Sequence, residues 1–569
     1  MNNELNIRIT GEAGQGIQTV GEALCRVFKR RGFYLFAHQD YMSRIRGGNN
    51  FFLIRVSSQP LFAARQKADI VVALDKESVA IHKNALSPDG ILIADKARFN
   101  IPDTTSSLFD VPLYGLATQF GGSELFVNST ACAVVAAMAG IEFSLAEEIL
   151  SALFRDKGEE LVKKNLAAAK AGYDFAAQHF SPEAFRMQIK TAAPEGQLLI
   201  NGNEAIALGA IRAGCKFYSA YPMTPSTSIM DNLAHFAKRF NILVEQAEDE
   251  IAAVNMIIGA SFAGCRAMAA TSGGGFALMV EGLSLAGMTE VPIVVVEAQR
   301  PGPATGFPTR TEQADLEFLI HAGHGEFARA IFSPGTIEEA FYLTVRAFDV
   351  AEKYQIPVLI MTDQHLADSY RNIEPFDLSR SPVKRHIISR AESKDILGYK
   401  RYQLTESGVS PRAIPSWIAD VIYADSDEHN EEGHITEDAT IRVKMVEKRL
   451  YKKLALLTKE IVPPSAYNLE NAQVVLAGFG STYGVMREVC VDKRIGFIHF
   501  SQVWPFPSQQ AVALLKGAKK IFTVENNAAG QLKRLIRREI GINPDGAIRK
   551  FDGRPFDRDN LREKIQEVI

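Results

Sequence analysis

The fold is decided around the stretch AMAATSGGG (residues 267–275), where an apolar strand candidate runs directly into three consecutive glycines. A helical stretch follows from Phe276 to Gly287, and a second apolar run, Val291 to Val296, begins shortly after it. This order of strand, glycine turn, helix and strand is typical of a βαβ unit with parallel strands. In such sheets, ligands bind in the loops that follow the strands.

The same alternation continues on both sides of this stretch. Further strand candidates lie at Lys216–Ser219 and Pro357–Met361, and helical stretches lie at residues 203–213, 251–263 and 337–354. Buried parallel strands covered by helices on both faces give this pattern. We therefore expect a largely parallel, doubly wound domain over residues 198–370.

The remainder of the chain predicts further α/β units. Residues 1–190 open with a strand, Leu5–Ile9, then glycines between Gly11 and Gly16, then a helical stretch, and a linker is expected at residues 181–196. A polar connecting region is expected at residues 371–464. A last α/β unit, residues 465–569, carries strand candidates at residues 474–476, 496–500 and 520–524. The sequence thus predicts a multidomain α/β protein.

Composition excludes several classes of protein. The 569 residues carry 63 lysines and arginines against 66 acids, so no basic surface for nucleic acid is expected. Apolar runs such as residues 131–140 are far shorter than the roughly 20 residues that span a bilayer, so we expect a cytoplasmic protein. The five cysteines are widely spaced and form no C-x-x-C pair, so no metal ligand set is expected in this chain.

A rigid, hydroxyl-rich loop follows the strand candidate at Lys216–Ser219. Its sequence is YPMTPST (residues 221–227), in which two prolines fix the backbone just before a helix. Ser226 or Thr227 is expected to cap that helix. Thr224, held beside unpaired helix amides, is suited to bind a small carboxylate or carbonyl group.

Two other segments carry charged candidates. Glu250 closes an acidic triplet where a helix begins, and acids at that position often only stabilise the helix dipole. The proline-rich stretch QRPGPATGFPTR (residues 299–310) follows the strand Val291–Val296. Arg300, Thr309 and Arg310 in this stretch could pair a carboxylate, although an ordered surface turn is the alternative.

The N-terminal glycines have two readings from sequence. A glycine loop before a helix can cradle a phosphate, or it can simply form a tight turn. The spacing G-x-x-G-x-G from Gly11 to Gly16 is not the dinucleotide fingerprint G-x-G-x-x-G. Neither reading identifies a ligand.

Together, residues 221–228, 248–259, 271–275 and 299–315 resemble the α subunits of the 2-oxoacid:ferredoxin oxidoreductases. The 2-oxoglutarate-type chains with a fused N-terminal γ domain are the most similar. The resemblance extends to YMSRIRGG (residues 41–48), to the connecting region around residues 399–402 and 425–435, and to VENNAAGQL (residues 524–532). One departure is Ala13, where many γ domains carry glycine. The resemblance implies a γ-type domain at 1–190, a pyrimidine-binding thiamine diphosphate domain at 198–370 and a transketolase-C-like domain at 465–569.

The resemblance also implies an activity. Family members decarboxylate a 2-oxoacid on thiamine diphosphate, transfer the acyl group to coenzyme A and pass two electrons to ferredoxin; 2-oxoglutarate is the expected substrate, with pyruvate or a broad range of 2-oxoacids as the alternative. Because the chain contains neither Gly-Asp-Gly nor close cysteine pairs, Mg²⁺ and a [4Fe-4S] cluster are expected on a separate β subunit, in an (αβ)2 assembly.

Matched position by position, the resemblance assigns roles to six residues. Glu250 would be the catalytic carboxylate that contacts N1′ of the cofactor's aminopyrimidine ring. Thr224, Arg300 and Thr309 would bind the substrate, and Tyr221 and Pro222 would contact the cofactor. No metal ligand is implied on this chain.

Two other hypotheses belong to different classes. One is a phosphate- or nucleotide-binding dehydrogenase that uses the N-terminal glycine loop, against which the glycine spacing argues. The other is a non-catalytic scaffold that binds coenzyme A and organises a catalytic partner. The scaffold hypothesis predicts that a change at Glu250 leaves turnover intact.

Overall fold

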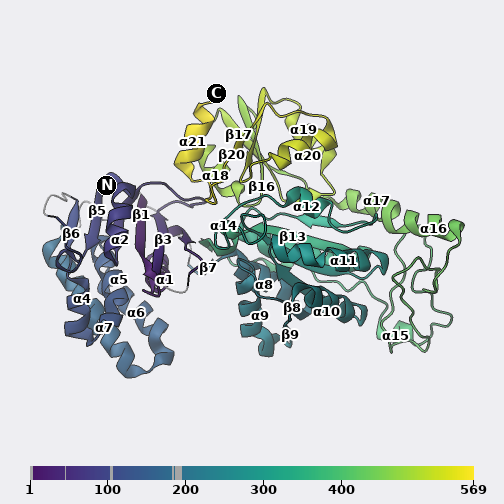
Figure 1. Cartoon of the computed structure of the whole chain (residues 1–569), viewed down its shortest axis with the longest axis horizontal. Coiled ribbons are helices and arrows are strands. Elements are labelled where there is room, and N and C mark those ends of the chain that lie inside the picture. Colours follow the sequence, from purple (N-terminus) through teal and green to yellow (C-terminus); the bar gives the residue numbers. More distant parts are fainter. Residues whose placement is uncertain (1–3, 45–46, 103–106, 182–184, 186–194, 569) are drawn as a thin grey trace. The chain divides into compact units, whose positions relative to one another are not determined.

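The computed structural model describes residues 4–44, 47–102, 107–181, 185 and 195–568 (Figure 1). The chain forms two compact units. The first contains residues up to 200 with residues 369–375 and 557–563, and the second contains residues 201–368, 376–556 and 564–569. Most of the expected linker at residues 181–196, and Ile45 and Arg46 of the stretch 41–48, lie outside the described residues.

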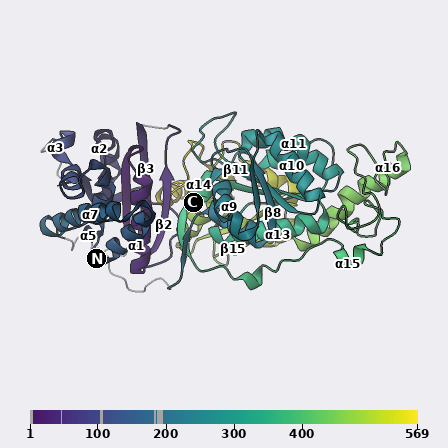
Figure 2. The same cartoon turned by 90° about the horizontal axis from the view of Figure 1, so that it is seen from below.

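The first unit is a mixed sheet covered by helices (Figure 2). Its eight strands lie in the order β6-β5-β4-β1-β3-β2-β14-β7. The strands are β1 (Glu4–Ala13), β2 (Tyr34–Asp40), β3 (Gly47–Ser57), β4 (Ala68–Ala73), β5 (Leu86–Ala94), β6 (Leu108–Asp110), β7 (Leu198–Ile200) and β14 (Tyr370–Ile373). The α-helices are α1 (Ile17–Arg31), α2 (Lys76–His82), α3 (Lys96–Phe99), α4 (Leu113–Leu116), α5 (Val127–Met138), α6 (Phe143–Phe154) and α7 (Glu159–His179).

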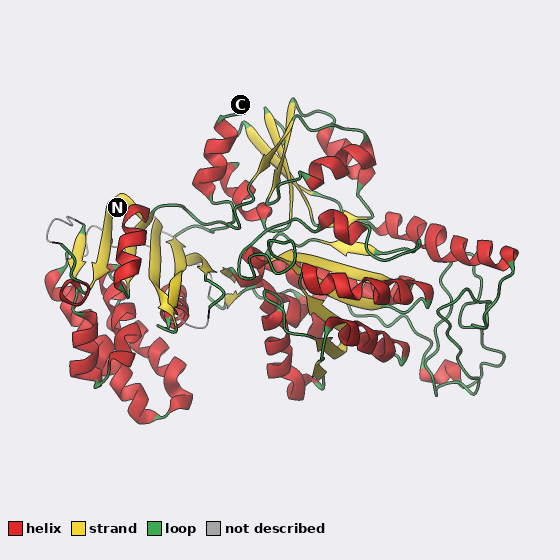
Figure 3. Cartoon of the chain, viewed as in Figure 1, coloured by secondary structure: helices red, strands yellow, loops and turns green. Residues whose placement is uncertain are grey.

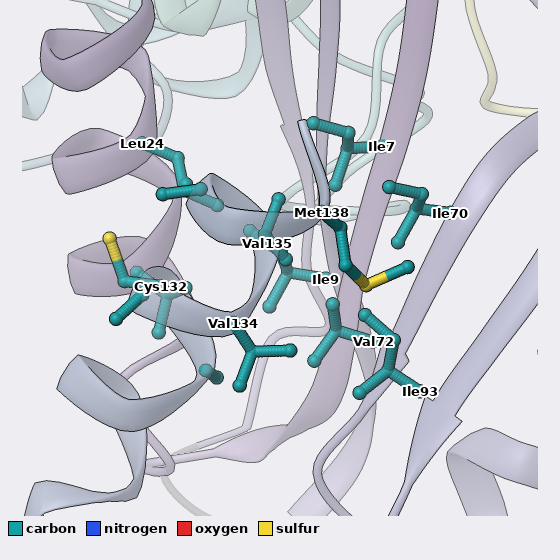
Figure 4. Packing of buried hydrophobic residues seen from close by; sticks show 14 of the residues in the cluster. Ile7, Ile9, Leu24, Ile70, Val72, Ile93, Cys132, Val134, Val135 and Met138 are labelled. Atoms are coloured by element: carbon teal, nitrogen blue, oxygen red, sulfur yellow. The ribbon is translucent and has the colours of Figure 1, made fainter. Parts of the chain in front are cut away.

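The core of this unit lies between the central strands and helix α5. Figure 4 shows Ile9 of β1 and Val72 of β4 packed near Val134 and Met138 of α5. Nearly every residue of α5 is buried, because its sequence is apolar on all sides rather than on one stripe. A helix of this kind is stable only inside a protein core.

Two local predictions for this unit need correction. Gly11 does not belong to a loop: it lies in β1 and pairs with Asn50 of β3, so only Gly14 and Gly16 adopt the left-handed backbone of the turn. The strand expected at Leu198–Asn201 exists, but it pairs with β14, which in turn pairs with β2. It therefore ends the first sheet rather than opening the second. The domain boundaries themselves remain predictions.

The second unit is built on a largely parallel sheet, as the alternating pattern predicts (Figure 3). Its order is β18-β12-β13-β11-β10-β8-β9, and only the β12–β18 pair is antiparallel. The strands are β8 (Cys215–Ala220), β9 (Leu243–Gln246), β10 (Arg266–Thr271), β11 (Ile293–Gln299), β12 (Ala330–Phe332), β13 (Pro357–Asp363) and β18 (Gln502–Trp504). The helices are α8 (Gly202–Arg212), α9 (Thr227–Phe240), α10 (Glu250–Phe262), α11 (Gly273–Met288), α12 (Leu316–Ile320), α13 (Ile337–Tyr354) and α14 (Gln364–Asp368).

A smaller sheet and a loop-rich region complete the second unit. The five-stranded sheet has the order β15-β17-β16-β19-β20. Its strands are β15 (Ser465–Tyr467), β16 (Val474–Phe479), β17 (Ile495–Phe500), β19 (Lys520–Glu525) and β20 (Gly546–Arg549), and its α-helices are α18 (Thr482–Val489), α19 (Ser508–Leu515) and α20 (Gln531–Ile540). The last helix, α21 (Arg558–Gln566), belongs to the first unit over residues 558–563. The region before it carries the short helices α15 (Arg390–Ser393), α16 (Ala439–Val446) and α17 (Lys453–Leu457).

Among the described residues, no individual helix combines the length and the apolar character needed to cross a bilayer; one sharply bent pair, Leu113–Gly121 with Glu124–Met138, meets the criteria of length and composition.

Candidate active site

The predicted site lies where the parallel strands of the second unit end. Strand β10 pairs with β8 on one side and with β11 on the other. The loops that follow these strands therefore emerge at the same edge of the sheet. They carry residues 221–227, residues 272–275 and residues 300–314.

Glu250 is a buried carboxylate at the first position of α10. Asp249 caps this helix by accepting a hydrogen bond from the Ala252 amide at 2.7 Å, so Glu250 is not needed as a cap. Only 4% of Glu250 is exposed, and Oε1 is buried with no hydrogen-bond partner among the described residues. A buried, unsatisfied carboxylate oxygen is costly, which indicates that a donor from elsewhere completes it.

Two glycines of α11 allow α10 to approach closely. A Cβ atom on Gly275 would lie 2.4 Å from Glu250 Oε1 and 2.1 Å from Thr271 Oγ1. A Cβ atom on Gly282, two turns along, would lie 2.6 Å from Val254. The glycines after β10 therefore serve to bring the start of α11 against the Glu250 carboxyl group.

Arg300 and Thr224 are brought together directly. Arg300 Nη1 donates a hydrogen bond to the Thr224 carbonyl oxygen at 2.7 Å, which joins the loop after β11 to the loop after β8. Burial lowers the pKa of Arg300, but a guanidinium remains protonated. The loop after β8 is held from below by Asn203 Nδ2, which donates to the Pro225 carbonyl at 2.7 Å.

The remaining predicted residues frame these groups. Thr309 is buried with 8% exposed, Pro222 is half-buried, and Tyr221 is 42% exposed. Met223 Sδ lies 3.9 Å from Thr271 Oγ1, so the Thr224–Arg300 pair and the Glu250–Gly275 contact are connected through neighbouring side chains.

The expected side-chain cap of α9 is wrong. Ser226 occupies the cap position but makes no capping bond; its hydroxyl donates instead to the Met223 carbonyl at 2.7 Å. The hydroxyl thus tightens the turn of the rigid loop rather than satisfying the helix amides. This leaves the start of α9 without a side-chain cap from Ser226.

Sequence reasoning missed an acidic layer beside the site. Glu297 in β11 is fully buried. Its burial, and to a lesser extent the negative charge of nearby Asp315, raises the pKa of Glu297 well above the ordinary value. Asp315 itself lies under the start of α11, since a Cβ atom on Gly273 would be 2.5 Å from its Oδ2. The available signal was Glu297 itself, a charged residue inside an otherwise apolar strand.

The donor set fits an organic cofactor better than a metal ion. Within the described residues, no group of three or more His, Cys, Asp or Glu side chains is arranged to hold a metal. Glu250 instead offers one buried acceptor oxygen beside a cluster of glycines. A heterocycle with a ring N–H donor suits such a position.

Comparison with known proteins identifies the family. Residues 6–175 match the family model described as pyruvate ferredoxin/flavodoxin oxidoreductase, and residues 208–448 match the thiamine diphosphate-binding model of the pyruvate flavodoxin/ferredoxin oxidoreductases. The chain is 33% identical to the 2-oxoacid:ferredoxin oxidoreductase α subunit of a Sulfolobus species, over 99% of this chain and 96% of that protein.

Other relatives carry narrower names. The 2-oxoglutarate synthase subunit KorA of Methanothermobacter marburgensis is 30% identical, over 65% of this chain and 98% of its own length. The solved 2-oxoglutarate:ferredoxin oxidoreductase of Magnetococcus marinus, with 2-oxoglutarate, coenzyme A and succinyl-CoA bound, matches with a TM-score of 0.91 and 31% identity over 100% of both chains. The chain therefore belongs to the α subunits of the 2-oxoacid:ferredoxin oxidoreductases, oxidoreductases with a thiamine diphosphate-binding domain.

Proposed function

We propose that this chain is the α subunit of an enzyme that converts 2-oxoglutarate, coenzyme A and two oxidised ferredoxins into succinyl-CoA, CO2, two reduced ferredoxins and a proton, or runs the reverse reaction. The observation that carries the proposal is the unpartnered Glu250 Oε1 beside the loop pair formed by Arg300 and Thr224. A cofactor-facing carboxylate and a substrate-facing cation thus occur at the same sheet edge.

Glu250 would hold the aminopyrimidine ring of thiamine diphosphate. When bound, this cofactor supplies the carbon nucleophile for the 2-oxo group and an electron sink for the decarboxylation. The part of Glu250 is to accept the ring N–H at Oε1 and to exchange a proton there. Its burial keeps water from competing for that hydrogen bond.

Arg300, Thr224 and Thr309 would bind the 2-oxoacid. A planar guanidinium pairs with a carboxylate through two parallel N–H bonds, and neighbouring hydroxyl groups can complete the carboxylate's lone pairs. The bond from Arg300 Nη1 to the Thr224 carbonyl uses one donor and fixes the plane of the group. The remaining N–H groups would then donate to the substrate carboxylate. Tyr221 and Pro222 would line the cofactor side.

A β subunit would complete the enzyme. The cysteines support a cluster on another subunit. Four of the five are buried, and no two are closely spaced in sequence, as the ligands of an iron–sulfur cluster usually are. Mg²⁺, the cofactor diphosphate and the [4Fe-4S] cluster would then lie on β, in an (αβ)2 assembly that reduces ferredoxin. Exposed apolar side chains on the helices beside the site, Ile251 (49%) and Leu278 (49%), support a partner surface here.

The names of the relatives favour 2-oxoglutarate as the substrate. Three KorA proteins and the Magnetococcus structure are named for it, whereas five other relatives, the Sulfolobus protein among them, are named for 2-oxoacids in general. Pyruvate or a broad range of 2-oxoacids is therefore the competing substrate assignment.

The deciding experiment uses the chain co-expressed with a β subunit that carries Gly-Asp-Gly and clustered cysteines. Coenzyme A-dependent reduction of ferredoxin would be measured with 2-oxoglutarate and with pyruvate as a matched pair. A higher kcat/KM for 2-oxoglutarate supports the proposal. Equal values would favour the broad-range alternative, and no reduction with any 2-oxoacid would refute the proposed activity.

A further inference from the structure

Gln313 is fully buried in the segment that joins the substrate loop to α12, and it lies outside the predicted site. Its amide nitrogen Nε2 donates to Asp363 Oδ2 at 3.1 Å and to the Phe479 carbonyl at 3.0 Å. Its amide oxygen accepts a hydrogen bond from the Asn526 backbone N–H at 3.2 Å. Each of these partners stands at the end of a different strand: β13, β16 and β19.

The backbone of Gln313 makes two more bonds to the C-terminal sheet. Its N–H donates to the Asn526 carbonyl at 2.7 Å, and its carbonyl accepts from Asn527 Nδ2 at 3.1 Å. All four hydrogen-bonding groups of Gln313 are therefore occupied. A buried amide satisfied so completely is a precise anchor, because any displacement leaves several polar groups unpaired at once.

The anchor stands at the base of the loop that carries Arg300 and Thr309. At the start of that loop, Gln299 Oε1 accepts a hydrogen bond from the Asp315 amide at 3.0 Å, which closes the base. Three prolines stiffen the segment between these two points. A stiff loop of this kind moves as a body, so its base sets where Arg300 and Thr309 lie.

The segment that follows β20 also supports the far side of the loop. The Thr311 amide donates to the Gly553 carbonyl at 3.4 Å. A Cβ atom on Gly553, whose φ is +75°, would lie 3.0 Å from the Phe307 ring and 3.3 Å from Arg310 Cβ. The loop therefore packs against residues that are some 240 positions away in sequence.

We propose that Gln313 is a positioning residue through which the C-terminal domain holds the substrate loop, residues 300–312, in its binding position. This inference rests on the proposed function for the identity of the substrate. It gives the C-terminal domain a role in substrate recognition without any substrate contact of its own. Rate is sensitive to such positioning, since a 1 Å misplacement can cost about 100-fold.

The test compares two isosteric substitutions in the complex with the β subunit. Gln313→Glu removes the Nε2 donors and places a carboxylate against the Phe479 carbonyl and Asp363. Gln502→Glu is the matched control, because buried Gln502 also accepts from a backbone amide (Val462, 2.9 Å) and donates to a backbone carbonyl (Pro505, 3.2 Å).

Two readouts separate positioning from general stability. Hydrogen exchange of peptides covering residues 300–312 should accelerate at least about tenfold in Gln313→Glu and stay unchanged in Gln502→Glu. The kcat/KM for the 2-oxoacid should fall about 10- to 100-fold only in Gln313→Glu, with KM for coenzyme A unchanged. If Gln313→Glu does not fold, the uncharged Gln313→Met variant of similar size carries the same two measurements.

The outcomes are distinct for the two proposals. Unchanged exchange in the loop, or equal acceleration throughout the unit in both variants, overturns the role of Gln313. Absence of 2-oxoacid turnover in the wild-type complex overturns the proposed function, whereas the exchange measurement still decides whether Gln313 holds the loop.

Discussion

Two buried glutamates at opposite edges of the seven-stranded sheet have opposite surroundings. Glu250 lies at the carboxyl edge, near the end of β10, and its Oε1 has no partner among the described residues. Glu290 lies at the amino edge, just before β11, and is also fully buried. Its carboxylate binds Lys448, and it accepts from Lys453 Nζ at 2.5 Å.

The difference between them separates a structural ion-pair cluster from a candidate binding site. Burial alone would raise the pKa of Glu290, but the two lysine ammonium groups lower it well below the ordinary value. Arg401 adds a bond to the Glu290 carbonyl at 2.7 Å, so the connecting region is fixed to the sheet by a satisfied cluster. Glu250 has no such compensation, which is what a group awaiting a ligand requires.

The largest expected effect is on Glu250. Glu250→Gln should lower thiamine-dependent turnover in the complex with the β subunit by about 10²–10⁴-fold, because the isosteric amide cannot exchange the proton. Folding and assembly should persist. The measurement is the exchange rate of the C2 proton of bound thiamine diphosphate.

Glu248→Gln is the control for this substitution, since Glu248 is exposed and adjacent in sequence. Equally slow C2-proton exchange in both variants, or fast exchange in the Glu250 variant, would mean that another carboxylate does the work. A stability loss of only about 0.3–1 kcal/mol with activity preserved would restore the helix-dipole role.

The next largest effect is expected from disrupting the ion-pair cluster of Glu290 with Lys448 and Lys453. Glu290→Gln leaves two buried ammonium groups without their counter-charge, and breaking a buried pair in this way costs about 3–5 kcal/mol of unfolding free energy. Denaturant titration measures that loss, and limited proteolysis should show cleavage within residues 377–464. The control is Glu447→Gln, because Glu447 is exposed and lies next to Lys448 in sequence. Equal stability of the two variants would contradict the comparison.

A smaller effect is expected at Arg300. Arg300→Ala should reduce kcat/KM for the 2-oxoacid about 30- to 1000-fold, since a charged hydrogen bond in a desolvated site is worth roughly 2–4 kcal/mol. Arg300→Lys should recover only part, because an ammonium cannot reproduce the planar fork. Steady-state kinetics with several 2-oxoacids checks this, and an unchanged kcat/KM for all of them would remove Arg300 from the site.

The smallest effect on activity is expected at Glu297, another buried glutamate. Burial and Asp315 raise its pKa, so the folded state keeps a proton that the unfolded state loses above about pH 4.3. Its contribution to stability is therefore complete at low pH and is lost as pH rises toward the folded-state pKa, by up to about 1.4 kcal/mol per pH unit. Glu297→Gln, an isosteric change that removes the ionisable group, should lose this pH dependence and keep turnover.

Thermal unfolding between pH 5 and 8 tests this prediction. Relative to the wild type, the Glu297→Gln variant should gain stability as pH rises. If the stabilities of the wild type and the variant changed equally with pH over this range, Glu297 would be ionised in the folded protein and the prediction would be wrong.

Local sequence patterns account for much of the fold. Apolar runs predicted β8, β10, β11 and β13 to within a few residues, because a strand buried on both faces must be apolar along its whole length. The pairing of β7 with β14 was missed, since the two segments lie some 170 residues apart and neither shows in sequence which neighbour it joins.

The candidate site also combines features set by local sequence with contacts between distant segments. The sequence by itself determined the helix start at Glu250, the rigid loop with Thr224 and the proline-rich loop with Arg300, because chain stiffness and capping are properties of adjacent residues. Only the tertiary structure decided that Arg300 meets Thr224, that Lys448 and Lys453 neutralise Glu290, and that Gln313 binds three strand ends. Hydrogen bonds and charge pairs between distant segments depend on how the chain closes on itself, and no local pattern records that closure.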